Sequence, residues 1–351
     1  MNATAAERAS GGPLFAAGRA VHFGPSTTHV GGMGSVIANI VRGGLGAERV
    51  DAFATWVPGS HSRSAVLTAR AAAVVSRLPA GTVVHLHMSE RGSFLRETSV
   101  LAAAKMRGLP CVVTIHGAEF ADFSRRHRRL VAAALGMANV VTVLSEVDRQ
   151  AVERLGVPAH VELVPNPCAL DREAGRAADT EELVLFAGEV GKRKGADVLR
   201  EAWPLVAARR PQARCLIVGP ATELRLASTP GLELRGPVPP HQVQTLIRRA
   251  RAIVLPSRGE ALPMILTEAM AAGRPFVSTP TGGIAAIKEG GLLVPVDDAE
   301  ALAAALTGLL ADPQLAQRIG DSGRELCRLE LSPEVIDARM RAVYARAREP
   351  R

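Results

Sequence analysis

Two successive sets of short apolar runs, each run followed by a helical pattern, constrain the fold of this chain most strongly. Such alternation is typical of a parallel sheet covered by helices on both faces. The first set predicts strands at 19–23, 50–54, 82–86, 110–115, 139–144 and 160–164. The second set predicts strands at 183–187, 214–218, 252–255, 276–279 and 292–294. We therefore expect two α/β units of similar size within the 351 residues.

A polar, charged segment at 166–180 has no apolar periodicity and predicts the linker between the two units. We place the N-terminal domain at 14–170 and the C-terminal domain at 171–330. Residues 1–13 are small, polar and rich in glycine, which predicts a flexible leader. A last amphipathic helix within 331–351 follows the final strand, and it can pack back on the N-terminal domain or stay with the second.

The charge balance narrows the class of partner. With 42 Lys and Arg against 34 Asp and Glu, the net charge of +8 favours phosphorylated small molecules, an anionic membrane surface or nucleic acid. Only 3% of the residues are aromatic and no recognition module is evident, so we do not expect nucleic acid as a partner.

Other sequence features bear on location and on cysteine chemistry. No apolar run reaches the roughly 18 residues of a membrane helix, and the N-terminus lacks the order of a secretory signal, so we expect a cytoplasmic protein. The four cysteines are far apart in the sequence and lack metal-ligand spacing. Disulfides and a structural zinc ion are therefore not expected.

The segment 252–283, AIVLPSRGEALPMILTEAMAAGRPFVSTPTGG, carries the most chemical information. An apolar strand ends at Pro256, a short loop follows, and a helix is predicted from near Pro263 to just before Gly273. A helix that begins beyond the carboxyl end of a strand presents unpaired N–H groups and the positive end of its dipole to an anion. The segment therefore predicts a phosphate site.

Two acidic residues flank this predicted phosphate site. Glu260 lies in the loop and Glu268 about five residues into the helix, roughly 7 Å further along the axis. A carboxylate beside a phosphate site can accept hydrogen bonds from hydroxyl groups of the same ligand. A nucleotide sugar, with a diphosphate between two sets of hydroxyls, fits both acids. From these residues alone, a solvated Glu268 and a Glu260 that merely lies near the helix N-terminus are an equally good interpretation.

Glu260 and Glu268, separated by seven residues, resemble the E-x7-E motif of the retaining GT4-type glycosyltransferases, which have the GT-B fold. The resemblance covers nearly the whole chain and implies two Rossmann-like domains whose parallel sheets face each other across a cleft. Further segments resemble the same family in the same order: GGMGSV at 31–36, TIHG at 114–117, VLSE at 143–146, VPNP at 164–167, KG at 194–195, LIVGP at 216–220, RGPV at 235–238 and TGG at 281–283.

The resemblance assigns roles at the predicted helix start. Glu268 would hold the ribose hydroxyls, and Glu260 would act in catalysis by holding a hydroxyl of the transferred sugar. Backbone N–H groups of Leu262 and Met264 would meet the phosphates, since Pro263 between them has no N–H.

The segment FAGEVGKRKGAD at 186–197 would bind the same diphosphate. Gly188 ends a strand, and cations at Arg193 and Lys194 can neutralise charge on the leaving nucleoside diphosphate, with Lys194 at the position of the family's lysine. The family usually has an arginine directly after the first glycine, whereas this chain has Glu189. This departure leaves open a weak enzyme, a cation shifted to Lys192 or Arg193, or a protein that only binds its ligand. A solvated charged loop is the alternative for the whole run.

Glycines and histidines of the N-terminal half complete the predicted site. Gly32 and Gly34, in a loop expected to open a helix at about Ser35, would let the backbone approach the donor, although a simple tight turn is an alternative. His116 ends a predicted strand, and by resemblance it lies near the reacting carbon of the sugar; a purely structural histidine is the alternative. His85 and His87 form an HxH pair without an evident third ligand, so we interpret them as cleft lining or packing.

The strongest basic run, SRRHRRL at 124–130, has two interpretations. The usual one is a solvated helix face. By resemblance, the same run would contact a lipid-linked acceptor or the anionic inner face of the cell membrane. The arginines concerned are Arg125, Arg126, Arg128 and Arg129.

The resemblance therefore implies a hexosyltransferase that moves a sugar from a nucleotide sugar, most simply a UDP-sugar, to a sugar, lipid-linked or small-molecule acceptor with retention. We expect the nucleotide sugar as co-substrate, no cofactor and no metal, because no DxD-type acidic cluster is evident. A nucleotide-sugar 2-epimerase and a non-catalytic nucleotide-sugar binding protein stay open as alternatives. An NAD-dependent oxidoreductase is disfavoured because Gly31 to Gly34 lack the full GxGxxG spacing.

Overall fold

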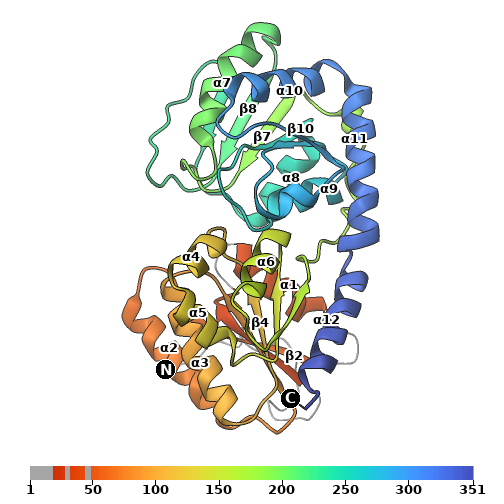
Figure 1. The fold of residues 1–351 in the computed structure, drawn as a ribbon. Coiled ribbons are helices and arrows are strands. Elements are labelled where there is room, and N and C mark those ends of the chain that lie inside the picture. Colours follow the sequence, from red (N-terminus) through yellow and green to blue (C-terminus); the bar gives the residue numbers. More distant parts are fainter. Residues whose placement is uncertain (1–18, 28–31, 44–48, 351) are drawn as a thin grey trace. The chain divides into compact units, whose positions relative to one another are not determined.

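The structure is a computed structural model, and it describes residues 19–27, 32–43 and 49–350. The predicted leader at 1–13 and Gly31 of the glycine-rich segment lie outside these residues. The chain divides into two compact units (Figure 1). Unit 1 comprises Met1–Pro167 and Pro333–Arg351, and unit 2 comprises Cys168–Ser332.

Unit 1 contains a six-stranded parallel sheet in the order β2-β1-β3-β4-β5-β6. The six strands predicted in this half are confirmed, with shifts of at most two residues at their ends. The strands are β1 (Arg19–Pro25), β2 (Arg49–Trp56), β3 (Val83–Met88), β4 (Cys111–Ile115), β5 (Val140–Val143) and β6 (His160–Leu163). The helices are α1 (Gly32–Gly43), α2 (His61–Val75), α3 (Gly92–Met106), α4 (Phe120–Arg126), α5 (Arg128–Leu135), α6 (Glu146–Glu153) and α12 (Pro333–Ala347).

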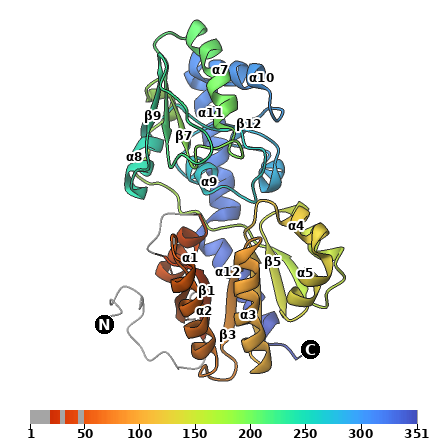
Figure 2. The same cartoon turned by 90° about the vertical axis from the view of Figure 1, so that its left-hand side faces the viewer.

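The two faces of this sheet are covered by different helices. Figure 2 shows α2 and α3 on one face and α12 on the other. Val21, Phe23, Val84 and Leu86 pack with the α2 and α3 side chains in one apolar core. Because side chains alternate along a strand, the residues between them point toward the face that α12 covers.

Unit 2 contains a second six-stranded parallel sheet, in the order β12-β11-β10-β7-β8-β9. The sequence predicted five of these strands and missed β9, whose residues LELR carry two charges and lie at the edge of the sheet, where only Leu232 is buried. The strands are β7 (Leu183–Ala187), β8 (Arg214–Val218), β9 (Leu232–Arg235), β10 (Ala252–Leu255), β11 (Phe276–Ser278) and β12 (Gly291–Leu293). The helices are α7 (Ala196–Arg209), α8 (Pro240–Arg249), α9 (Met264–Ala271), α10 (Ala299–Ala311) and α11 (Pro313–Leu326), with short turns at Ala177–Asp179, Gly282–Ala286 and Cys327–Leu331.

The chain enters and leaves unit 2 at neighbouring points. The Cys168 N–H donates a hydrogen bond to the Leu331 carbonyl at 2.8 Å, and the Cys327 thiol lies 3.6 Å from the Cys168 carbonyl oxygen. All four cysteines are buried free thiols. Within the described ranges, no helix is both long and apolar enough to span a membrane.

Each sheet has one point where the strand order changes direction. This switch lies between β1 and β3 in unit 1 and between β7 and β10 in unit 2. In open parallel sheets, ligands bind beyond the carboxyl ends of the strands at such a point. A ligand site is therefore expected at the loops after β7 and β10 and at the ends of β1 and β3.

Candidate functional site

The loops after β7 and β10 pack directly on each other in unit 2. Gly195 has φ of +72°, and a Cβ atom on it would lie 1.9 Å from the carbonyl oxygen of Pro256. Gly219 has φ of +141°, and its Cβ would lie 1.7 Å from the carbonyl oxygen of Gly188. Only glycine fits at these two positions. The predicted Gly188 thus lies where three segments meet closely, directly beyond β7.

This packing brings three of the predicted site residues together. The Nζ atom of Lys194 lies 2.6 Å from Oε1 of Glu260, and the nearest Arg193 nitrogen lies 3.5 Å from the same oxygen. The Ser257 hydroxyl donates a hydrogen bond to this carboxylate at 2.9 Å. The Glu260 side chain is only 7% exposed. Glu260 is therefore a buried loop acid near the start of α9 that is paired with cations.

Glu189, which stands where the family usually has arginine, has partners of its own. Its carboxylate lies 3.4 Å from Arg193, and the Thr222 hydroxyl donates to it at 3.1 Å. Both charged side chains are 35% exposed. The acid is thus held beside a compensating cation, and Arg193 connects it to Glu260.

Glu268 lies on α9 in a different environment. Its side chain is half-buried, and its carboxylate has no hydrogen-bond or ion-pair partner among the described residues. Burial raises the pKa of Glu268 to about 7. A fully solvated helix-surface glutamate, which the sequence allowed, does not fit this environment. An unpartnered carboxylate in this position is available to accept hydrogen bonds from a ligand.

The start of α9 supplies backbone donors between the two acids. The helix begins at Met264 after Pro263, as predicted to within one residue, and Leu262 is buried just before it. The first N–H groups of a helix have no intrahelical acceptor. Gly282 packs against the same loop and has φ of +53°. Only glycine fits there, because a Cβ atom would lie 1.7 Å from the Glu260 carbonyl oxygen. The TGG motif thus supports the loop backbone, a role that the sequence alone did not reveal.

The glycines of unit 1 differ from their prediction. Gly32 and Gly34 lie in the first turn of α1, which begins at Gly32 rather than at about Ser35. Glycine has a low helix propensity, so the sequence placed the helix start too late. Gly32 is exposed with no atom within 4 Å of a Cβ position, whereas Gly34 is buried.

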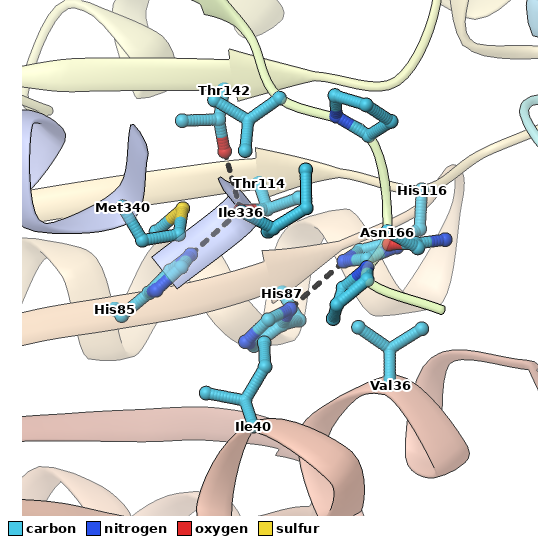
Figure 3. Close-up of a pocket in the computed structure, with 13 residues that line it drawn as sticks. Val36, Ile40, His85, His87, Thr114, His116, Thr142, Asn166, Ile336 and Met340 are labelled. Atoms are coloured by element: carbon cyan, nitrogen blue, oxygen red, sulfur yellow. Dashed lines mark hydrogen bonds between the residues drawn. The ribbon is translucent and has the colours of Figure 1, made fainter. Parts of the chain in front are cut away.

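His116 follows β4 and lines a pocket at the carboxyl edge of the unit 1 sheet, shown in Figure 3. Its backbone N–H donates to the Met88 carbonyl at 2.8 Å, and its Nε2 lies 2.8 Å from Nδ1 of His87. Burial lowers the pKa of His116 to about 3. The pocket is small, with a water-accessible volume of about 20 Å³, and it combines histidine and threonine side chains with apolar residues of α1 and α12.

A third histidine, which the sequence analysis missed, stands beside the HxH pair. His22 on β1 is the register partner of His85 on β3, and ring nitrogens of His22, His85 and His87 all lie within 4.8 Å of one another. The three side chains are almost fully buried, and His85 and His87 line the pocket of unit 1. The signal was His22 at an alternating position of the first strand, but it becomes useful only once β1 is known to pair with β3.

The basic run is divided between two helices. Helix α4 ends at Arg126 and α5 begins at Arg128, with His127 between them. All four predicted arginines are exposed; Arg125 pairs with Asp122 at 2.9 Å, and Arg128 donates to the Arg154 carbonyl at 3.0 Å. The structure places these arginines on unit 1 and the paired acids on unit 2.

Two parallel six-stranded sheets with this connectivity define a GT-B glycosyltransferase fold. A structure of Anabaena Alr3699/HepE in complex with UDP and glucose superposes with a TM-score of 0.72 over 93% of this chain and 99% of that one, at 15% identity. A sucrose-phosphate synthase from Thermosynechococcus elongatus gives a TM-score of 0.71 over 93% and 98%, at 20% identity.

Family models identify the chain more narrowly. Residues 31–167 match the glycosyl transferase 4-like domain, and residues 181–312 match glycosyl transferases group 1. Together the matches cover more than three quarters of the sequence, and the chain belongs to the GT4-type glycosyltransferases.

The curated relatives are similar over part of the chain. A phosphatidyl-myo-inositol mannosyltransferase of Mycolicibacterium smegmatis is 36% identical over 172 residues, which are 46% of this chain and 44% of the relative. A D-inositol 3-phosphate glycosyltransferase of Thermobispora bispora is 30% identical over 244 residues, which are 61% and 56%. The chain spans about half the length of the curated relatives it matches.

Proposed function

We propose that this protein transfers a hexose from a nucleoside diphosphate sugar, most simply a UDP-sugar, to an acceptor hydroxyl with retention at the anomeric carbon. The observation that carries this proposal is the pair of acids at the start of α9. Glu268 is half-buried and has no partner in the part of the chain that the structure describes, Glu260 is buried beside two cations, and the donor N–H groups lie between them in sequence.

Each end of the donor has a matching group in unit 2. The Glu268 carboxylate accepts hydrogen bonds from the ribose hydroxyls, the N–H groups near Leu262 and Met264 meet the diphosphate, and Glu260 accepts a hydroxyl of the sugar. UDP is the favoured nucleoside diphosphate because the similar Alr3699/HepE was solved with UDP-glucose. Retention is proposed from membership of the family.

Positive charge at the diphosphate would assist departure of the leaving group. Lys194 and Arg193 share Glu260, so an incoming diphosphate competes with that carboxylate for the two cations. Their attraction to the diphosphate grows as its charge increases in the transition state. We propose that these cations do the work that a divalent ion does elsewhere, so that transfer proceeds in EDTA; strict dependence on a divalent ion would contradict this.

The acceptor side belongs to unit 1. His116 and its pocket lie at the carboxyl edge of the sheet, where an acceptor or sugar hydroxyl can reach the imidazole. The exposed arginines of α4 and α5 would hold an anionic acceptor or an anionic membrane surface. A lipid-linked, saccharide or small-molecule acceptor is compatible with this arrangement.

A ligand panel tests the proposal directly. The melting temperature of the full chain is measured with UDP, GDP, ADP and TDP, and then with the corresponding sugars, because a ligand of the folded state stabilises it by mass action. We expect one nucleotide and its sugar to stabilise the chain in a concentration-dependent way. The configuration of the product formed with simple acceptors is then read by NMR; an inverted anomer would reject retention, and no stabilisation by any nucleotide would reject the donor site.

Conversion of the donor distinguishes the remaining alternatives. A 2-epimerase changes the donor sugar without any acceptor, whereas a binding protein leaves the donor intact. The pairing of Glu189 with Arg193 removes the main argument for a non-catalytic protein, because the acid does not face the site uncompensated.

A further inference from the structure

A continuous chain of hydrogen bonds runs beneath the pocket of unit 1, on the sheet face that α12 covers. It begins at His116, whose Nε2 meets His87 Nδ1 at 2.8 Å, and His87 Nε2 meets His22 Nδ1 at 2.8 Å. The Tyr344 hydroxyl then joins His22 Nε2 at 2.8 Å to His85 Nδ1 at 2.9 Å. Beyond it, His85 Nε2 lies 2.6 Å from the Thr114 hydroxyl, which lies 2.5 Å from that of Thr142. We call these seven residues the histidine chain; Figure 3 shows its two ends, the His87–His116 contact and the contacts from His85 to Thr142.

All hydrogen bonds of the histidine chain can form while every imidazole is neutral. A neutral imidazole has one N–H and one acceptor nitrogen, and a hydroxyl donates one proton while accepting others. If every group donates to its neighbour in the same direction, each contact holds one proton and every ring nitrogen inside the chain is satisfied. Both directions meet this condition. The chain therefore accounts for the buried histidines as neutral groups.

The surroundings of the chain favour the neutral state. Burial lowers the pKa of His22 to about 3. Burial also lowers the pKa values of His85 and His87, and the neighbouring histidines lower these two values further. No carboxylate is among the groups that shift these values. The elements packed around the pocket contribute the apolar residues Val36 and Ile40 from α1 and Ile336 and Met340 from α12, together with Asn166 from the segment 164–167.

His116 is the member through which the chain meets a ligand. Its Nε2 is bound to His87, while its Nδ1 has no partner among the described residues and the side chain is partly exposed. Because a neutral imidazole holds one proton, the contacts from His22 through His87 to His116 point in one direction, and that direction decides whether His116 Nδ1 carries a proton. The chain thus couples the tautomer of His116 to its neighbours: Nδ1 is a donor to a hydroxyl in one direction and an acceptor in the other.

Three of these histidines, His22, His85 and His87, lie close enough together to be tested against the geometry of a zinc site. Nitrogens bound to one tetrahedral zinc ion at 2.0–2.1 Å lie about 3.3 Å apart. The His22–His87 nitrogens are instead 2.8 Å apart, and the rings of His85 and His87 are stacked at 19° with centroids 4.5 Å apart. These distances and angles favour hydrogen bonding, and metal binding becomes an outcome of the experiment.

We infer that His22, His87 and Tyr344 are positioning residues, which hold the His116 imidazole neutral, in one orientation and in one tautomer, so that Nδ1 is an uncharged hydrogen-bonding group and not a base. This inference rests on the proposed function, since it assumes that His116 faces a ligand. Tyr344 contributes from the last helix of the chain, more than two hundred residues from the other members.

Histidine NMR on the full chain tests the inference without any substrate. With ¹⁵N-labelled histidine, and with His116 assigned by its loss in His116→Gln, we expect the signals of one neutral tautomer between pH 5 and 8. Tyr344→Phe removes the hydroxyl but keeps the ring, and it should allow a second tautomer of His116. His160→Gln, an exposed histidine on β6, is the matched control and should leave the His116 signals unchanged. A wild-type His116 that titrates near its ordinary pKa would overturn the inference even if Tyr344→Phe does not fold.

Kinetics separate positioning from a general loss of structure. In Tyr344→Phe we expect kcat to fall about ten-fold, as for loss of one buried hydrogen bond, with a nearly unchanged donor KM and a pH profile like that of the wild type. An unchanged kcat together with an unchanged His116 tautomer would refute the role of Tyr344. If no donor is turned over, the proposed function fails in the ligand panel, while the NMR result still decides on the histidine chain.

A zinc titration provides the remaining outcome. After treatment with EDTA and its removal, the full chain is titrated with Zn²⁺ and bound metal is measured by mass spectrometry. We expect no stoichiometric binding that depends on His22. One tightly bound zinc ion per chain that is lost in His22→Gln would show a metal centre and overturn the inference.

Discussion

At the scale of single residues, Glu260 and Glu268 are close in sequence, with only seven residues between them, but their environments differ. Glu260 is compensated by Lys194 and Arg193, whereas Glu268 is half-buried, has no partner within residues 19–27, 32–43 and 49–350, and has its pKa raised to about 7. Burying an unpaired carboxylate costs free energy in the ligand-free chain. A residue that destabilises the free protein in this way is typical of a binding site.

The first prediction concerns donor binding by Glu268. Glu268→Gln should weaken binding of the stabilising nucleotide sugar about 10- to 100-fold, because hydrogen bonds to a charged group contribute about 1.5–3 kcal/mol. Isothermal titration calorimetry measures the affinity. Glu201→Gln, an exposed glutamate on α7, is the control and should bind as the wild type does. Equal affinities for the wild type and Glu268→Gln would remove Glu268 from the site.

The second prediction concerns pH. Donor affinity of the wild type should fall as pH drops below about 7, because protonated Glu268 accepts fewer hydrogen bonds, and it should be nearly constant in Glu268→Gln. The raised pKa means that the folded chain holds this proton more tightly than the unfolded chain. Its stabilising contribution is thus present at low pH and is lost as pH rises through about 7.

The same pKa shift predicts a change in stability that opposes the change in binding. Glu268→Gln should raise the free energy of unfolding at pH 8 by about 1–3 kcal/mol, and by much less at pH 4. Denaturant unfolding at the two pH values measures the difference. A variant less stable than the wild type at pH 8 would show that the carboxylate has a stabilising partner.

The third prediction concerns Lys194. Lys194→Ala should lower kcat about 100-fold, as removal of one group that stabilises transition-state charge does, with a smaller effect on donor KM. Steady-state kinetics of sugar transfer measures both constants. Lys105→Ala, an exposed lysine in unit 1, serves as control. If kcat is retained in Lys194→Ala, departure of the nucleoside diphosphate does not depend on the Lys194 cation.

At the scale of elements, short helices present charge outward. Helices α4 and α5 meet at His127, and the arginines on either side of it are exposed, together with Leu130, which is 42% exposed. Cations beside an exposed apolar side chain suit an anionic surface whose interior is apolar.

The fourth prediction tests this surface. The triple variant Arg125→Glu, Arg126→Glu and Arg129→Glu should lose binding to anionic liposomes, measured by co-sedimentation at low salt, while Arg128 keeps its hydrogen bond to Arg154. The triple variant Arg63→Glu, Arg70→Glu and Arg77→Glu makes the same charge change on and beside α2, where the side chains are also exposed, and should retain binding. Wild-type protein that does not bind the liposomes even at low salt would reject a membrane role.

At the scale of the whole molecule, unit 1 is built from two separate parts of the chain. The segment Pro333–Arg351 returns to the unit formed by the first 167 residues, and α12 buries Ile336, Met340, Val343 and Tyr344 there. Unit 2 is continuous, with its own sheet and core. The stability of unit 1 should therefore depend on the end of the chain, and that of unit 2 should not.

The fifth prediction follows from this arrangement. A chain ending at Ser332 should lose several kcal/mol of unit 1 stability, at about 1.5–3 kcal/mol for each large apolar side chain removed from the core. Calorimetry should show one transition moved to lower temperature and a second transition unchanged. A chain lacking only Pro350 and Arg351 is the control. A single unchanged transition after removal of α12 would contradict independent stabilisation of the two units.

The sequence was sufficient for the strands, both sheets and the start of α9, because these depend on local patterns: apolar runs of strand length, and a proline and glycine that bound a helix. It was insufficient at β9, because two charged residues in a short edge strand interrupt the apolar pattern. It was also insufficient at the start of α1, because glycines in the first turn have a low helix propensity. Its interpretation of the HxH pair was incomplete because His22 is distant in sequence.

The sequence by itself determined that the chain is a doubled parallel α/β protein of the GT4 type, since periodicity and motif order need no knowledge of contacts. Only the tertiary structure decided which charges compensate one another. Glu189 pairs with Arg193, Glu260 pairs with Lys194, Glu268 finds no partner among the residues whose structure is described, and Tyr344 joins two histidines. These outcomes depend on strand order and burial, because the energy of a charge or a hydrogen bond depends on the groups and the dielectric that folding places around it.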